Sequence, residues 1–314
     1  MKPSEAAALL KSADNILIIT HKKPDGDTIG SASALCHALR KLGKNVYLFK
    51  NAEVTKRLLP YCERYFAPED FIAEYYLSVD VADTDMVAVG ADFTYDLVID
   101  HHPTNPQFGK NNCIDAKKSS SGEIVLDVIK SLNGSLDKSE ANLLYIAIST
   151  DTGCFQYSNT NSDTFFAASE LLEYGAQNSK LNEKFFRKVT KERINLESRI
   201  YGGFKYYSDG KVVVSTITRE MISSCGASED DLEDVAGLPG RVEGEIVGIV
   251  IRENDDGTCK ISMRSKEEVN SSEICAYFGG GGHKMAAGCT IEAEPEKAEK
   301  LIIEVLQSVW TDFS

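Results

Sequence analysis

The chain has 314 residues, and its 48 Asp and Glu residues outnumber its 34 Lys and Arg residues to give a formal net charge of -14. This balance argues against long duplex nucleic acid as a partner, because such affinity needs many cationic contacts to phosphates, but it is compatible with a small anionic ligand. No stretch reaches the roughly 20 apolar residues of a membrane span, and the N-terminus lacks the apolar core of a secretory signal. We therefore expect a cytoplasmic protein with no membrane partner.

The first half of the chain alternates strand patterns with helix patterns. Each expected strand is a short apolar run, and several of these runs stop at an acidic residue. Such alternation is typical of parallel strands joined by helices, which indicates an α/β fold. The expected strands cover 15–20, 45–50, 75–82 and 95–100, and the expected helices cover 27–43, 120–132, 138–153 and 162–176.

The second half has a different pattern. A polar helix is expected around 186–200 and a strand at 211–218. A hairpin over 244–266 follows, with the Asp-Gly pair at 256–257 as its turn. A last helix is expected over 295–309, and it closes the second half.

These patterns predict two domains. The first covers 1–188 and has a mainly parallel sheet flanked by helices. The second covers 201–314 and is a smaller α/β domain with a mixed sheet. Residues 189–200, within the polar helix, are expected to act as a helical linker between the two.

Acidic and imidazole side chains stand where the expected strands of the first domain end. In an open parallel sheet, ligands bind beyond the carboxyl ends of the strands, so these positions are candidates for chemistry. Asp151 joins them from the end of an apolar helix. The candidate residues are His21, Asp25, Asp27, Asp80, Asp100, His101, His102 and Asp151.

Hard carboxylates with one or two imidazoles favour Mn²⁺, Co²⁺ or Mg²⁺ over a zinc site built from thiolates. Two ions about 3.5–4 Å apart need a bridging carboxylate, for which Asp80 is the natural candidate, and they could activate a water for attack on phosphorus. A lone Asp is more often a cap or a turn residue, and a lone His is more often structural. The joint pattern favours the metal site, whereas His37 inside an expected helix is interpreted as structural.

A glycine tract in the second domain, "YFGGGGHKMAAG", leaves two interpretations open. It is either a flexible loop or a backbone that approaches a ligand closely and donates its N–H groups to a phosphate. Arg264, in an expected strand, is either a bidentate phosphate clamp or an ordinary surface arginine. The sequence alone does not decide between these alternatives.

Five motifs in order resemble those of the DHH/DHHA1 phosphoesterases, most closely their NrnA-like branch of oligoribonucleases and pAp phosphatases. The motifs are "HKKPDGDTIGS", "SVDVAD", "DHH", "STDTG" and "GGGGHKMAAG". The resemblance implies two Mn²⁺ ions in an active site that lies in the interdomain cleft. One ion would be held by His21, Asp25 and Asp80, and the other by Asp27, Asp80, His101 and Asp151.

The same resemblance assigns the remaining roles. His102 would face the substrate phosphate or support the attacking water, and Asp100 would orient an imidazole, as histidines at metal sites generally require. In the second domain, Arg264 and His283, with the glycines 280–282, would bind the terminal phosphate of the substrate. Ser31 is a further candidate for substrate binding, with an ordinary helix-start residue as the equal alternative.

The leading hypothesis is a Mn²⁺-dependent phosphohydrolase, with Co²⁺ or Mg²⁺ as alternative ions, that degrades very short RNAs and removes the 3′-phosphate of pAp. A second enzyme hypothesis is hydrolysis of linear dinucleotides such as pApA, or of inorganic polyphosphate in the manner of a pyrophosphatase. A third hypothesis, from a different class, is a regulator that binds metal or nucleotide without turnover. A homodimer is compatible with each of them.

Overall fold

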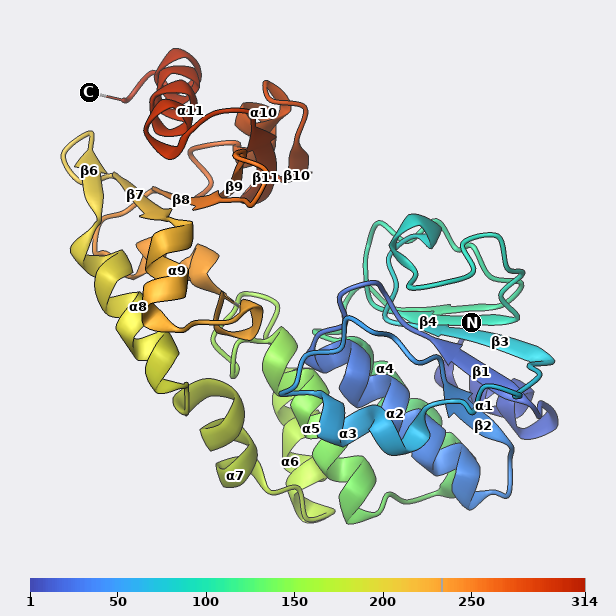
Figure 1. Cartoon of the computed structure of the whole chain (residues 1–314). Helices are drawn as coiled ribbons and strands as arrows, with labels where there is room; N and C mark the ends of the chain where they lie inside the picture. Colours follow the sequence, from blue (N-terminus) through green and yellow to red (C-terminus); the bar gives the residue numbers. More distant parts are fainter. Residues whose placement is uncertain (233, 314) are drawn as a thin grey trace. The chain divides into compact units, whose positions relative to one another are not determined.

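The structure, a computed structural model, describes residues 1–232 and 234–313. It divides into two compact units, Met1–Lys188 and Val189–Ser314, each with its own sheet (Figure 1). Within the described residues, no helix is both long and apolar enough to cross a membrane.

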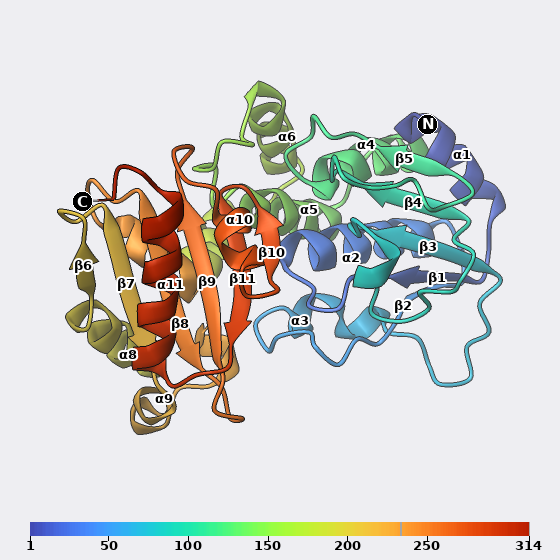
Figure 2. The same cartoon turned by 90° about the horizontal axis from the view of Figure 1, so that it is seen from above.

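The first unit contains a five-stranded sheet whose paired strands are all parallel, in the order β2-β1-β3-β4-β5 (Figure 2). The predicted mainly parallel sheet is therefore confirmed. The fifth strand was not expected from the sequence, because it is only three residues long. The strands are β1 Ile16–Ile19, β2 Val46–Leu48, β3 Tyr75–Val79, β4 Leu97–Asp100 and β5 Asn112–Ile114.

Helices flank this sheet and carry most of the apolar core of the unit. The expected helices are all present, and a further one at the N-terminus packs against α4. The helices are α1 Pro3–Ser12, α2 Gly26–Lys41, α3 Leu59–Cys62, α4 Ser121–Asn133, α5 Lys138–Asp151, α6 Ser162–Glu173 and α7 Asn178–Asn182, with short 3₁₀ turns at Glu63–Tyr65 and Thr84–Met86 and a π turn at Glu183–Arg187.

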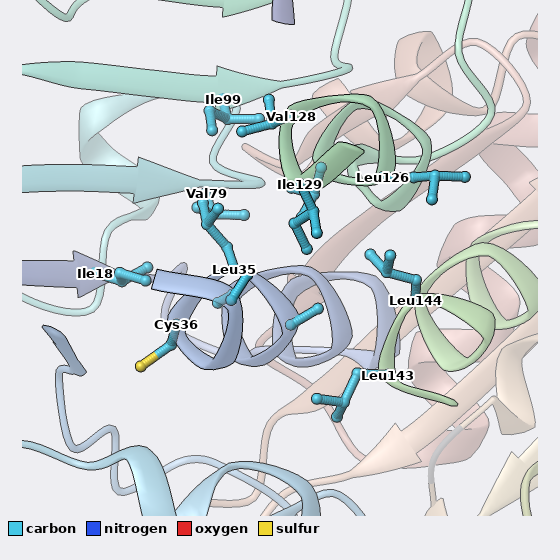
Figure 3. Packing of buried hydrophobic residues seen from close by; sticks show 14 of the residues in the cluster. Ile18, Leu35, Cys36, Val79, Ile99, Leu126, Val128, Ile129, Leu143 and Leu144 are labelled. Atoms are coloured by element: carbon cyan, nitrogen blue, oxygen red, sulfur yellow. The ribbon is translucent and has the colours of Figure 1, made fainter. Parts of the chain in front are cut away.

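Strand and helix side chains meet in one buried cluster (Figure 3). Ile18, Val79 and Ile99 come from three neighbouring strands, and each is 0% exposed. They pack with apolar residues of α2, α4 and α5, of which Leu35 and Ile129 are also fully buried. Because burial of one such side chain is worth roughly 1.5–3 kcal/mol, this cluster holds the strand ends and the helix starts in fixed positions.

Helices α2 and α5 approach each other closely at Gly30. A Cβ atom there would lie 2.9 Å from the backbone nitrogen of Ala147 and closer still to the carbonyl oxygen of Leu143. Only a residue without a side chain allows this approach. The glycine therefore fixes how α2 and α5 pack, and both helices carry candidate site residues at one end.

We predict that Gly30→Ala destabilises the protein by about 1–3 kcal/mol, because the added methyl group overpacks the contact with the α5 backbone. Urea unfolding followed by circular dichroism measures the change. Gly202→Ala is the control, since Gly202 ends a helix and a Cβ atom there would have no atom within 4 Å. A Gly30 variant as stable as the Gly202 variant would contradict the packing argument.

The second unit contains a six-stranded sheet in the order β10-β11-β9-β8-β7-β6. The β7–β8 pair is parallel and the other pairs are antiparallel, so the predicted mixed sheet is confirmed. The hairpin is present as β8 and β9, with Gly257 at a positive φ of 80° in its turn. The strands are β6 Lys205–Tyr207, β7 Val212–Ile217, β8 Val247–Glu253, β9 Cys259–Ser265, β10 Gly281–His283 and β11 Ala286–Ile291.

Helices cover the two faces of this second sheet unequally. The last helix packs with strand residues such as Val247 and Ile249 on one face (Figure 2). On the other face, helices cover β7 and β8 around Ile217 and Val250. The helices are α8 Lys191–Gly202, α9 Arg219–Cys225, α10 Ser271–Ala276 and α11 Pro295–Val309, with 3₁₀ turns at Glu229–Leu232, Val235–Gly237 and Pro239–Arg241.

The start of α2 and the position of α8 bear on two boundaries predicted from the sequence. Helix α2 begins at Gly26 with Asp25 as its N-cap, one residue earlier than the predicted start at residue 27. The polar helix expected to link the domains is α8, and it lies within the second unit. The linker at 189–200 stays a prediction.

Candidate active site

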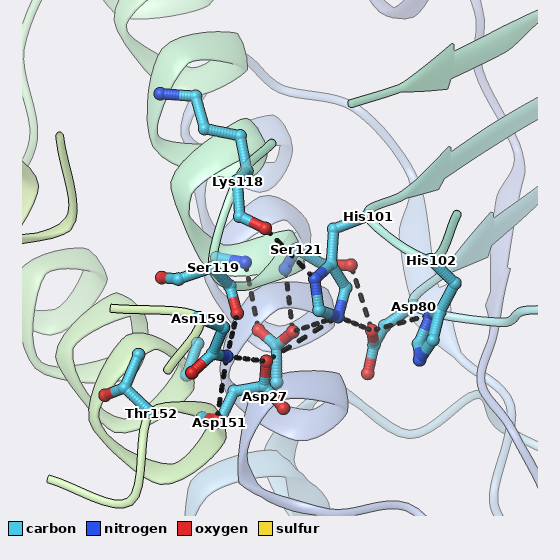
Figure 4. Close-up of polar contacts among 12 residues, drawn as sticks. Asp27, Asp80, His101, His102, Lys118, Ser119, Ser121, Asp151, Thr152 and Asn159 are labelled. Carbon is cyan, nitrogen blue, oxygen red and sulfur yellow. Dashed lines mark hydrogen bonds and ion pairs between the residues drawn. The ribbon is translucent and has the colours of Figure 1, made fainter. Parts of the chain in front are cut away.

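The candidate residues of the first unit lie together at the carboxyl ends of β1, β3 and β4 and near the termini of three helices. Figure 4 shows five of them, which are Asp27, Asp80, His101, His102 and Asp151. Three groups of side chains each bring one ligand atom per residue to within 4.8 Å of one another. The groups are His21 with Asp25 and Asp80, Asp27 with His101 and Asp151, and Asp80 with His101 and His102.

The turn between β1 and α2 is organised by the hydroxyl group of Thr28. Asp25 caps α2 by accepting hydrogen bonds at Oδ1 from the Thr28 backbone N–H and hydroxyl group, both at 3.0 Å. The same hydroxyl oxygen lies 2.6 Å from His21 Nε2 and 2.6 Å from Asp80 Oδ2. Since a hydroxyl group has one proton, it donates to one carboxylate at a time while its lone pairs face the other groups.

Asp27, in the first turn of α2, lies against the N-terminus of α4 and is 1% exposed. Its carboxylate accepts hydrogen bonds from the backbone N–H of Ser121 at 2.7 Å and of Gly122 at 2.9 Å. These are N–H groups that the first turn of a helix leaves without an intrahelical partner, and the helix dipole favours a negative charge there. The helix start therefore holds Asp27 in place inside the protein.

Asp80 follows β3 with a positive φ of 59°. This left-handed conformation is uncommon for a residue with a side chain, although Asp and Asn tolerate it best. The turn directs the carboxylate into the site, where Ser121 Oγ donates to Oδ1 at 2.9 Å. Asp80 is the acid shared by two of the three groups, the one with His21 and Asp25 and the one with His101 and His102.

A short chain of hydrogen bonds orients His102. Its Nδ1 lies 2.7 Å from Oδ1 of Asp100, a residue that is 0% exposed. The Asn105 side chain donates to the other oxygen of Asp100 at 2.7 Å and to the Val81 carbonyl at 2.9 Å. The bond at Nδ1 leaves Nε2 as the ring nitrogen that can contact a ligand.

His101 and Asp151 lie close to each other and to Asp27 (Figure 4). His101 Nδ1 lies 3.3 Å from the Lys118 carbonyl oxygen, and its Nε2 lies 3.6 Å from Asp151 and 3.8 Å from Asp27. The Asn159 side chain donates to the backbone carbonyl of Asp151 at 3.1 Å and to its carboxylate at 3.4 Å. The loop after α5 thus helps to hold the last residue of that helix.

Crowding of the carboxylates shifts their proton affinities upward. Burial and the charge of Asp80 raise the pKa of Asp27 well above its usual range. Burial, followed by the charges of Asp80 and Asp25, raises the pKa of Asp151 to about 8. Part of the Asp25 carboxylate faces solvent, yet the surrounding protein and Asp80 also raise its pKa. Like charges are held together here, which is unfavourable unless cations neutralise them.

The neighbouring imidazoles lower the pKa of one carboxylate, and the carboxylates raise the pKa of one imidazole. Burial acts to raise the pKa of Asp80, but the positive charges of His101 and His102 outweigh it, so that pKa is lowered. Burial opposes protonation of His102, but the hydrogen bond and charge of Asp100 raise its pKa to about 9. Asp80 is therefore the carboxylate most readily ionised in this cluster.

The candidates in the second unit lie near one another on the sheet. Arg264 pairs with Ala286, and Ala286 pairs with His283, so the arginine and the histidine are in one row across three strands. Residues paired in this way point to the same face of a sheet. Gly281 and Gly282 belong to β10, and Gly280 packs directly over Cys289, with its N–H donating to the Cys275 carbonyl at 3.0 Å.

Ser31, a candidate either for substrate binding or for an ordinary place in the helix, is fully buried. Its hydroxyl group donates to Asp27 Oδ1 at 2.9 Å. Asp27 and Ser31 are four residues apart on α2, a spacing that puts them on the same helix face. The serine therefore supports the carboxylate from behind. His37 contacts Asp137 and Tyr65, in agreement with the structural role assigned to it.

Residues 15–148 match the DHH family, N-terminal domain, and residues 198–311 match the DHHA1 domain. A Thermus thermophilus protein named bifunctional oligoribonuclease and PAP phosphatase NrnA is 32% identical over 310 residues, which cover 97% of this chain and 93% of the relative. The chain belongs to the DHH/DHHA1 family of phosphoesterases. The family resemblance of the five motifs is confirmed.

Solved structures of DHH-related proteins share this fold. An exopolyphosphatase-related protein from Bacteroides fragilis has a TM-score of 0.88 at 24% identity, with 98% of this chain and 96% of that chain covered. The exonuclease RecJ bound to manganese has a TM-score of 0.58 at 15% identity, with 100% and 95% covered. At these identities the likeness concerns the fold alone.

The chemistry of the donors fits divalent cations of the hard type. The oxygen atoms come from four carboxylates, three with a raised pKa and Asp80 with a lowered one. The imidazoles of His21 and His101 complete the two sets of ligand atoms. Carboxylate oxygens with imidazole nitrogens suit Mn²⁺ or Mg²⁺ better than a thiolate-preferring ion. The structure thus brings together the residues that the DHH resemblance implies as ligands, and their assignment stays a prediction.

Sequence reasoning missed the polar residues that support this DHH site. Thr28, Asn105, Ser121 and Asn159 donate hydrogen bonds to the candidate ligands or to Asp100. Thr28 could have been found from its position three residues after a capping Asp. The other three come from loops or helix starts distant in sequence, so no local signal marks them.

We predict that Thr28→Val weakens Mn²⁺ binding about 10–100-fold, the usual cost of losing a group that orients metal ligands. Titration calorimetry with Mn²⁺ measures the change directly. Thr20→Val is the matched control, because Thr20 is also a buried threonine, and its hydroxyl group has no hydrogen-bond partner among the described residues. Equal affinities in the two variants would show that the Thr28 hydroxyl group does not organise the site.

Proposed function

We propose that this chain is a Mn²⁺-dependent phosphohydrolase that degrades very short oligoribonucleotides and dephosphorylates pAp to AMP. The observation that carries the proposal is the convergence of two sets of hard ligands on Asp80, beside an imidazole fixed by Asp100. The printed names of the relatives, oligoribonuclease and PAP phosphatase, support the substrate class. The acidic net charge of -14 fits a small substrate better than a long one.

Two divalent ions would be held by the residues that the structure brings together. His21, Asp25 and Asp80 would hold one ion. Asp27, Asp80, His101 and Asp151 would hold the other. When bound, such ions supply positive charge that stabilises the phosphoryl group in the transition state and favours ionisation of water.

The protein groups around this centre have distinct tasks. Asp100 fixes the His102 ring through Nδ1, so that Nε2 can donate to a phosphoryl oxygen as negative charge develops there. Thr28 and the start of α4 keep the carboxylates in position before the substrate arrives. Such preorganisation lowers the barrier because little rearrangement is needed during the reaction.

The second unit would bind the terminal phosphate of the substrate. Arg264 offers a planar, bidentate guanidinium group, and His283 lies in the same row of the sheet. Neighbouring glycine N–H groups would add donors without side chains in the way. The location of the active site in an interdomain cleft stays an expectation from the sequence.

We predict rapid, chelator-sensitive release of nucleotide or phosphate from pAp and RNA 2- to 5-mers in the presence of Mn²⁺. The reason is that a few phosphates match the two proposed ions and the few cationic side chains of the proposed site. Chromatography of the products from a panel that adds pApA, a 24-mer RNA and polyphosphate makes the measurement.

Other outcomes of this panel would change the proposal in defined ways. A strong preference for polyphosphate over every nucleotide would overturn the substrate class but keep the metal site. Turnover of pApA alone would point to a dinucleotide phosphodiesterase. Inertness towards every substrate, with retained nucleotide binding, would favour a regulator.

We predict that Asp80→Asn lowers kcat/KM at least about 100-fold, because it removes the carboxylate shared by both ion sites. Asn tolerates the positive φ of this position, so the fold and the melting temperature should be preserved. Asp83→Asn is the matched control, since it removes the same charge from an exposed residue three positions away. Residual activity above a tenth of the wild-type value in Asp80→Asn would contradict the bridging role.

A further inference from the structure

One face of the sheet in the second unit stays open over three strands. Strands β9, β11 and β10 pair in register, so that their residues form rows across the sheet. The first row is Arg264, Ala286 and His283, which the proposed function uses for the terminal phosphate. The next row is Ser262, Gly288 and Gly281, and the third begins with Lys260 and Thr290.

The middle row has almost no side chains on its open face. A Cβ atom at Gly281 would have no atom within 4 Å, and one at Gly288 would meet only the Ile261 carbonyl oxygen, at 3.0 Å. Together with Ser262, these glycines make a flat strip of bare backbone. Such a strip lets a planar ring lie directly against the sheet.

A groove of about 480 Å³ extends from this strip, away from the Arg264 row. Its lining includes Lys260 and Thr290 at the third row, Gly288 in the floor, and Phe278 from the segment that leads into β10. Lys260 is exposed, and it pairs with Arg252 of β8 across the sheet. The groove therefore offers an aromatic ring and a positive charge close together.

We propose that this groove is a second nucleotide subsite, in which Lys260 contacts a phosphate and Phe278 contacts a base of an oligonucleotide. The inference rests on the proposed function and deepens it, because it says which residues recognise substrate length. Stacking on an aromatic ring combined with a cationic contact to the backbone is the common way to bind single strands without sequence preference.

The dimensions of the strip explain why length would matter. Lys260 and Arg264 are four residues apart on one strand, which corresponds to about 13 Å between their backbones. The two phosphates of pAp are attached to one ribose and span less than this distance. With both side chains standing upright from the sheet, a substrate anchored by its terminal phosphate at Arg264 would contact Lys260 better if it carried further nucleotides.

Binding without catalysis tests this subsite directly. Titration calorimetry in chelator compares pAp with the trinucleotide pApApA on the full chain. Wild-type protein should bind pApApA about tenfold more tightly than pAp, and Lys260→Ala should remove that advantage while leaving the affinity for pAp unchanged. The loss of one phosphate contact should also lower the slope of log affinity against log salt for pApApA by about 0.7.

Two further variants separate the groove from general charge and from packing. Lys300→Ala removes the same charge from α11, which covers the opposite face of the sheet, and it should leave both affinities unchanged. Phe278→Leu keeps most of the apolar volume but loses the ring, and it should weaken pApApA binding several-fold and pAp binding little.

Activity with Mn²⁺ gives an independent comparison. Lys260→Ala should lower kcat/KM for the trinucleotide about five- to tenfold, mainly through KM, and should leave turnover of pAp as in wild type. Equal losses for both substrates, no loss for either, or the same loss in Lys300→Ala would overturn the subsite. A protein that binds these nucleotides in the groove but hydrolyses none would instead overturn the proposed function.

Discussion

The first unit has to hold four carboxylates together at one edge of a sheet, against their mutual repulsion. Burial and neighbouring acids raise the pKa values of Asp25, Asp27 and Asp151, whereas the imidazoles lower the pKa of Asp80, so the gathering of these carboxylates is unfavourable by itself. Backbone N–H groups at the start of α4, the Thr28 hydroxyl group and two imidazoles offset part of this cost. The remaining negative charge would be neutralised by divalent cations, for which carboxylate oxygens are suitable ligands.

Tolerance of this repulsion requires a rigid support. The close approach of α2 and α5 at Gly30 places the N-terminus of one helix beside the C-terminus of the other, and these ends carry Asp27 and Asp151. The buried cluster around Val79 and Ile129 fixes the strands against the same helices. Packing far from the acids thus decides their separation, since a densely packed core does not deform continuously.

Much of this could be predicted from the sequence, and the exceptions have physical causes. Apolar runs that end in Asp or His predicted the parallel sheet and the candidate ligands. These are local signals, because the runs are read directly from the sequence and ligands bind beyond the carboxyl ends of parallel strands. The contact of Ser31 with Asp27 follows from their spacing of four residues on α2, and it favours the supporting role over direct contact with substrate. The supporting residues Asn105 and Asn159, and the row that joins Arg264 to His283, depend on tertiary pairing that no local pattern encodes.

The net charge of the whole chain and the cationic groups of the proposed site would act in opposite directions on a nucleic-acid substrate. A net charge of -14 disfavours an extended polyanion, whereas the proposed ion sites and the row of Arg264 would attract phosphate only locally. At physiological salt a charge acts over about 8 Å, so the attraction fades beyond the phosphates in direct contact. If the proposed subsite is correct, each further nucleotide outside the groove of Lys260 would add repulsion but no contact. Selection for short substrates would then follow from where the positive charge ends, without any part of the protein having to block a longer chain.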